Sequence, residues 1–317
     1  MTEPEASSRR DIWVDLLLYP GHTLPTAAAP VIVAAGLAVH DHVFLALPLF
    51  VGFLASWLIH VGGVFTDNYV LISEHPELPE HPELLAALKD GTLTLRGLML
   101  AIAACFVLAV LTGPYLLAVA GIPTIVLGLI GILASLGYCL GPVSMTRLGI
   151  ADLLFFIMFG IVAVAGAYYV QAAPVYGASA GTLLVPRALP LSAFVVGLPV
   201  GALITNVLLI DDIRDRKFDA LKGWHTEPVR FGLAFTRGEF VALAVFSYAL
   251  PFWFWLGLGF SPWVLLALLT LPEAISITRL VCTTDEFAKL RPMTRRAARL
   301  SLDYAILLAI GLAVFTP

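Results

Sequence analysis

Long apolar runs, separated by shorter polar segments, fill most of the chain from about Leu24 onward. Runs of 18 or more apolar residues are typical of membrane-spanning helices, and the weak alternation expected of a membrane β-barrel is absent. Backbone polar groups in lipid must be bonded within their own segment, so each run is predicted to be a helix. The pattern predicts nine transmembrane helices, at Leu24–Val39, Phe44–Phe65, Gly97–Leu111, Tyr115–Leu140, Ala151–Ala172, Leu189–Ile210, Phe240–Leu258, Pro262–Val281 and Leu300–Phe315.

Composition points the same way. Hydrophobic residues make up 60% of the chain and charged residues only 13%, whereas soluble domains carry about 25% charged residues. A soluble surface is therefore excluded, and the predicted fold class is an all-α membrane protein with one polytopic domain over residues 1–317. Residues 1–20 are predicted to form a cytoplasmic N-terminal segment. The net charge of −4 gives no indication of a nucleic-acid partner.

The basic residues fall almost entirely on one side of the predicted membrane. With nine spans, the N-terminus and the loops after even-numbered spans share one face, which receives the basic residues from Arg9 to Arg299 with the exception of Arg187. The positive-inside rule then predicts a cytoplasmic N-terminus and an external C-terminus in a bacterial-type cytoplasmic membrane. The same loops are the long polar ones, so the active site is expected to face the cytoplasm.

The strongest chemical signal comes directly after the sixth predicted span. If that helix continues, Asp211, Asp215 and Asp219 form one stripe with neighbours about 6 Å apart. A divalent cation compensates such like charges, and Mg²⁺ held by carboxylates plus substrate phosphates is a common arrangement. Arg214, Arg216 and Lys217 can bind phosphate oxygens. The alternative is a solvated, charge-rich helix end, but emergence from a membrane helix favours a functional site.

A second acidic pair follows the second predicted span. Asp67 and Glu74 are seven residues apart, or two helical turns, so they can share one helix face as metal ligands. The alternative is that both are solvated residues of a loop. The matching positions of the two acidic segments suggest two half-chains that face one central cavity. Arg147, between the fourth and fifth spans, is either a diphosphate ligand or a topology anchor.

These segments together resemble the UbiA superfamily of intramembrane prenyltransferases, and within it the 1,4-dihydroxy-2-naphthoate polyprenyltransferases of menaquinone biosynthesis. The resemblance covers nearly the whole chain. Its most specific part is the second Asp-rich motif with its Gly, Thr and Arg-x-Gly continuation. In this chain the motif residues are Arg214, Asp215, Asp219, Gly223, Thr226, Arg230 and Gly232, and the naphthoate branch is further indicated by Gly149, Asp152 and residues 168–171.

The first family motif, Asn-Asp-x-x-Asp-x-x-x-Asp, is only partly kept. The corresponding residues are Thr66, Asp67, Val70 and Glu74, so valine replaces one aspartate and glutamate replaces another. The lysine that is common after the glycine of the second motif is Trp224 in this chain.

The resemblance implies about nine transmembrane helices around a central cavity that opens to membrane lipid. It implies Mg²⁺ as cofactor, with a prenyl diphosphate and an aromatic acceptor, such as a quinone precursor, as substrates. The implied site residues are Asp67, Asp215 and Asp219 as catalytic residues; Asp67, Glu74, Asp211, Asp215 and Asp219 as metal ligands; and Arg147, Arg214 and Lys217 as diphosphate ligands.

Two other functions stay open at this point. A UbiA-type terpene cyclase would use the same metal and diphosphate chemistry, with an internal double bond in place of the aromatic acceptor. A lipid or small-molecule transporter would need no paired acidic clusters on one face. The sequence determines neither the acceptor, nor the prenyl chain length, nor the oligomeric state.

Overall fold

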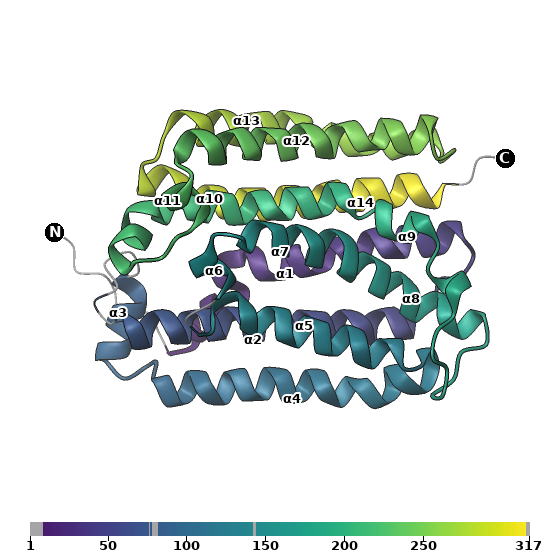
Figure 1. The fold of residues 1–317 in the computed structure, drawn as a ribbon, viewed down its shortest axis with the longest axis horizontal. Helices are drawn as coiled ribbons and strands as arrows, with labels where there is room; N and C mark the ends of the chain where they lie inside the picture. The colour runs from purple at the N-terminus through teal and green to yellow at the C-terminus, as the bar shows by residue number, and fades with distance from the viewer. Residues whose placement is uncertain (1–8, 76, 78–81, 142–143, 315–317) are drawn as a thin grey trace.

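The computed structural model describes residues 9–75, 77, 82–141 and 144–314. These residues form helices and no strand, and the longer helices lie side by side along one direction in an elongated bundle (Figure 1). The elements are α1 (Arg9–His40), α2 (Ala46–Glu74), α3 (Pro82–Lys89), α4 (Leu95–Ala120), α5 (Pro123–Cys139), α6 (Met145–Leu148), α7 (Ala151–Ile157), the π-helical turn η1 (Met158–Val162), α8 (Ala163–Val175), η2 (Pro186–Ala188), α9 (Leu191–Val195), α10 (Leu198–Lys222), α11 (Glu227–Arg230), α12 (Leu233–Leu256), η3 (Pro262–Thr270), α13 (Leu271–Thr283) and α14 (Phe287–Ala313).

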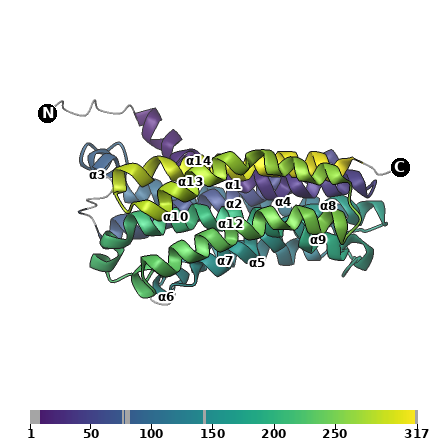
Figure 2. The same ribbon diagram turned by 90° about the horizontal axis from the view of Figure 1, so that it is seen from above.

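The two ends of the bundle differ in character. The short helices α3, α6 and α11 gather at one end, and α9 lies towards the other, where α14 also ends (Figures 1 and 2). The end with α3, α6 and α11 carries the polar connections that the sequence placed on the cytoplasmic side. Both acidic segments, at the ends of α2 and α10, therefore belong to the same end of the molecule.

Six helical segments of the described chain are long and apolar enough to cross a membrane. They are Thr23–His40, Ala46–Glu74, Leu95–Ala120, Ala151–Val175, Leu233–Leu256 and Pro262–Thr283. A seventh is added if residues 186–195 and 198–222, bent by 55° against each other, form one span, and α5 has the shorter length of 17 residues. The all-α membrane fold is confirmed, whereas the count of nine spans stays a prediction. The last predicted span lies within α14 as far as Ala313, and its end at Phe315 falls outside the described residues.

The predicted break between the third and fourth spans is wrong. We expected one helix to end at Leu111 and the next to begin at Tyr115, but α4 continues through Pro114 to Ala120. Membrane helices tolerate an internal proline because neighbouring groups satisfy the freed carbonyl. The chain turns instead at Gly121, whose φ of 83° is accessible to glycine at little cost, and Pro123 then begins α5.

Close backbone packing fixes α10 against α7 and η1. A Cβ atom added to Gly201 would lie 2.4 Å from the Cα of Gly160, so position 201 requires glycine, and one added to Gly160 would lie 3.0 Å from the Cα of Gly201. Small residues allow this approach where apolar lipid gives no hydrophobic drive to helix association. Gly223, in the left-handed conformation at φ 73°, then ends α10 just beyond its acidic stripe.

Candidate functional site

The acidic stripe after the sixth predicted span forms as expected. The helix α10 continues without interruption to Lys222, so Asp211, Asp215 and Asp219 follow one another at intervals of four residues. All three line a cavity of about 340 Å³ enclosed mainly by α2, α5, α7, η1, α8 and α10. The stripe is therefore the wall of a cavity rather than a solvated helix end.

Arg214 lies within this stripe and binds two of its carboxylates. Its Nε and Nη2 donate to the two carboxylate oxygens of Asp215 at 2.8 and 2.5 Å, and its Nη1 donates to Asp211. The hydroxyl of Thr294, on α14, donates to the same Asp211 oxygen at 2.5 Å. Arg214 is only 8% exposed. Its guanidinium group therefore holds Asp211 and Asp215 in fixed positions at the cavity wall.

Asp219 is positioned by two different groups. The Lys222 ammonium lies 3.2 Å from one carboxylate oxygen, and the Thr226 hydroxyl donates to the other at 3.1 Å. Thr226 comes from the turn that precedes α11, so the segment after α10 folds back onto the stripe. Lys222 and Thr226 both line the cavity.

The second helix contributes Asp67 and Asn68 to the opposite wall. Asp67 and Asp212 are the two cavity aspartates for which no hydrogen bond or ion pair is found within the described residues. Both carboxylates are therefore available to a ligand that enters the cavity.

The residues present fit a magnesium ion that is completed by substrate. The five aspartates Asp67, Asp211, Asp212, Asp215 and Asp219 line one cavity and offer the hard oxygen ligands that Mg²⁺ prefers. Within the described chain, however, no three of them bring carboxylate oxygens within 4.8 Å of one another, and only a different trio on α7, α11 and α12 does so. Mg²⁺ usually takes one or two carboxylates plus substrate phosphate oxygens. The spacing therefore suits an ion that is shared between the protein and a diphosphate.

Three predicted site residues do not line the cavity. Arg147 forms an ion pair with Glu74, one predicted ligand with another. Lys217 has a side chain that is 73% exposed and lies 3.9 Å from Asp285. Glu74, Arg147 and Lys217 can reach the cavity only by leaving these positions.

Beyond the acidic end, the cavity continues as a mainly apolar passage between the helices. Its wall extends along α2 from Leu71 back to Gly52 and along α5 from Tyr138 back to Thr124. At a rise of about 1.5 Å per residue, these stretches are each roughly 20 Å long or more. Phe155, Phe159 and many aliphatic side chains complete the wall. The shape fits an extended hydrocarbon chain that has one anionic end.

Sequence reasoning missed several lining residues. Asp212 could have been found, because it is three residues before Asp215 and seven before Asp219 on one helix. Lys222 could have been found in the same way, because it follows Asp219 by three residues and so lies near it on the same helix. Tyr138 on α5 carried no such signal, because only the packing of α5 against α2 brings it to the cavity.

Comparisons with known proteins agree with this geometry. A family model described as the UbiA prenyltransferase family matches residues 27–302. The 1,4-dihydroxy-2-naphthoate octaprenyltransferase of Escherichia coli (strain K12) is 27% identical over 98% of each chain. The enzyme of the same name from Mycobacterium tuberculosis is 27% identical over 92% of this chain and 94% of its own.

Solved structures show the same fold. A UbiA homologue from Aeropyrum pernix K1 superposes with a TM-score of 0.68 at 17% identity, over 92% of this chain and 96% of that one. A UbiA homologue from Archaeoglobus fulgidus bound to GPP and Mg²⁺ has a TM-score of 0.53 at 15% identity, over 93% of this chain and 98% of that one.

Proposed function

This chain belongs to the UbiA prenyltransferase family and is an integral membrane prenyltransferase; from that premise, we propose that it moves the prenyl group of a prenyl diphosphate to 1,4-dihydroxy-2-naphthoate or a close aromatic relative. One observation carries the proposal. A single cavity joins five aspartates, Arg214 and Lys222 at one end to a long apolar passage at the other. A prenyl diphosphate has the same division into an anionic head and an apolar tail. The naphthoate acceptor is suggested by the names of the bacterial relatives.

In this proposal the aspartates of α2 and α10 would hold Mg²⁺ when the prenyl diphosphate is bound. The ion, when bound, neutralises the leaving diphosphate. Arg214 keeps Asp211 and Asp215 oriented towards the cavity, and Thr226 does the same for Asp219. Lys222 already lines the cavity and is an additional candidate for a diphosphate oxygen. Arg147 and Lys217 would join it only after leaving Glu74 and Asp285, and Glu74 would become a ligand only after leaving Arg147.

The apolar passage serves the second half of the reaction. Breaking the allylic C–O bond leaves a carbocation that water would capture. Phe155, Phe159 and the aliphatic walls exclude water from the passage, so the ring of the acceptor becomes the nucleophile that is present. The ring carbon then forms the new C–C bond, and its proton passes to the released diphosphate or to solvent, which restores the aromatic ring.

We also propose that the acidic end faces the cytoplasm and that the prenyl tail extends towards membrane lipid. The basic residues support this orientation, because they gather at the end of α2 and α10. Single cysteines introduced at Glu77 and at Leu183, in a background without Cys105, Cys139 and Cys282, test it. A membrane-impermeant thiol reagent applied from outside should label the Leu183 site and spare the Glu77 site. Labelling of both from one side would contradict the orientation.

The decisive experiment is an assay of purified protein with Mg²⁺ and a prenyl diphosphate, with and without 1,4-dihydroxy-2-naphthoate. We expect diphosphate release and a prenylated aromatic product only when the acceptor is present. Diphosphate release with a cyclised product and no acceptor would instead identify a terpene cyclase. Substrate binding without any release would favour a transporter. Asp215→Ala provides the inactive control.

A further inference from the structure

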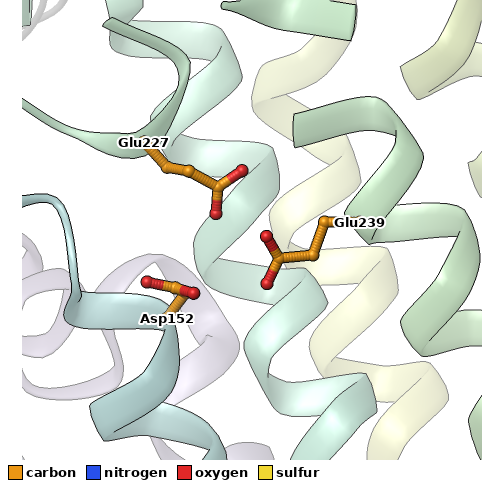
Figure 3. Close-up of side chains that lie close together, drawn as sticks. All are labelled: Asp152, Glu227 and Glu239. Carbon is orange, nitrogen blue, oxygen red and sulfur yellow. The ribbon is translucent and has the colours of Figure 1, made fainter. Parts of the chain in front are cut away.

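A second group of carboxylates lies outside the cavity, where α7, α11 and α12 meet (Figure 3). Asp152 is in the first turn of α7, Glu227 begins α11, and Glu239 is in the second turn of α12. One ligand oxygen from each residue lies within 4.8 Å of the other two. The three side chains point towards one another in Figure 3, and none of them lines the cavity described above.

Glu227 is the member of the group whose carboxylate oxygens lack hydrogen-bond partners among the described residues. Its side chain is directed into the group, the residue is 3% exposed, and neither of its carboxylate oxygens has a hydrogen-bond partner. An unpartnered buried carboxylate is costly, because the group loses its hydration and gains nothing in return.

No basic side chain compensates the group within the part of the chain that the structure describes. Lys and Arg form no ion pair there with Asp152, Glu227 or Glu239. Arg230, only three residues after Glu227, is directed elsewhere: its Nη1 donates to the Leu148 carbonyl at 2.6 Å, and its guanidinium lies 5.0 Å from the Phe231 ring centroid. The three carboxylates therefore repel one another, and no positive charge among the described residues offsets that repulsion.

We propose that Asp152, Glu227 and Glu239 bind a hard divalent cation at a site separate from the cavity and without any substrate. Three carboxylates and a divalent ion leave a net charge of −1, in place of three adjacent negative charges. Ligands that are all oxygen favour Mg²⁺, Ca²⁺ or Mn²⁺ over softer metals. The ion would connect α7, α11 and α12, which are separate elements of the fold.

The site has a direct connection to the cavity. Thr226, the residue before Glu227, donates its hydroxyl to Asp219 at 3.1 Å. A cation bound by Glu227 therefore fixes the segment that orients Asp219. Its role is to position this segment, and it is independent of the acceptor proposed above.

Mn²⁺ binding to purified protein tests the proposal without any substrate. The protein is stripped with a chelator, and free Mn²⁺ is followed by electron paramagnetic resonance during titration. We expect Glu227→Gln and Glu239→Gln to lose one equivalent of bound Mn²⁺, or to bind it about tenfold more weakly or worse. Asp215→Ala should keep that equivalent, because it alters only the cavity. Glu286→Gln, an exposed glutamate on the same side of the fold, is the matched control and should bind like wild type.

Thermal unfolding gives a second readout. Mn²⁺ or Ca²⁺ should raise the unfolding midpoint of wild type and of Asp215→Ala, and leave that of Glu227→Gln unchanged. In chelator, Glu227→Gln should be at least as stable as wild type, because the amide removes a buried charge. If Glu239→Gln does not elute as a folded protein, Asp152→Asn replaces it. Equal Mn²⁺ binding in wild type and in the Gln variants, or no Mn²⁺ binding by Asp215→Ala, would overturn the proposal.

Discussion

The acidic ends of α2 and α10 face one cavity but are built in different ways. On α10, four aspartates line the wall, and side chains from other elements hold two of them: Thr294 on α14 binds Asp211, and Thr226 before α11 binds Asp219. On α2, Asp67 is the acidic residue that lines the cavity. The polar neighbours of Asp67 bond within their own helix, Thr66 to the Gly62 carbonyl at 2.7 Å and Asn68 to the Val64 carbonyl at 2.9 Å.

The difference shows where the site is preorganised. Carboxylates held by hydrogen bonds from neighbouring helices keep their positions before any ligand arrives. On α10 this support is present at Asp211 and Asp219, whereas Asp67, like Asp212, has no partner within the described residues. We therefore expect α10 to be the fixed half of the metal site and Asp67 to be the half that depends on the ion.

The largest loss of activity should come from substitutions of the aspartates on α10. Asp215→Ala and Asp219→Ala remove carboxylates that are already in position, so turnover should fall by about 10²–10³-fold or more. Steady-state kinetics with saturating Mg²⁺ measure the loss, and size-exclusion elution confirms folding. A rate within a few-fold of wild type would show that the α10 aspartates are not metal ligands.

A smaller effect is expected from Asp67→Ala. The α10 aspartates remain in place, so the variant should need about tenfold more Mg²⁺ for half-maximal activity. A magnesium titration of the initial rate measures this shift. If Asp67→Ala lowers activity more than Asp215→Ala at saturating Mg²⁺, the order of the two halves is reversed.

Val70→Asp sharpens the comparison, because it restores an aspartate that the family motif contains. Val70 is 6% exposed and does not line the cavity. A carboxylate at this position is buried without a partner, so the thermal unfolding midpoint should fall and the Mg²⁺ requirement should not improve. Val70→Ala is the control for lost packing alone. A lower Mg²⁺ requirement in Val70→Asp would show that α2 can regain a ligand.

The smallest effect is expected from Glu74→Ala. The Glu74–Arg147 ion pair is partly exposed, and such pairs contribute little to stability. The unfolding midpoint should equal that of wild type within experimental error, and the Mg²⁺ requirement should stay within about twofold of wild type. Arg147→Ala should give the same two results. A Mg²⁺ requirement raised as much as in Asp67→Ala would establish Glu74 as the second ligand on α2.

Local patterns in the sequence already determined the membrane class, the helices and the acidic stripe. Hydrophobic runs identify helices in lipid because each segment must satisfy its own backbone. The period of the helix alone places Asp211, Asp215 and Asp219 on one face. The end of α4 was misplaced because Pro114 and Gly121 give competing local signals, and packing decided between them.

The partners of each charged side chain were decided only by the tertiary structure. The sequence placed Glu74 and Arg147 among the ligands, but the tertiary structure brings the two side chains together as an ion pair. Asp152, Glu227 and Glu239 are separated by up to 87 residues in the chain, and they converge only because α7, α11 and α12 meet at one end of the bundle. Helix periodicity acts over a few residues, whereas ion pairs and shared ligands depend on which helices become neighbours. The sequence therefore determined what each helix carries, and the packing of the bundle decided what each charge faces.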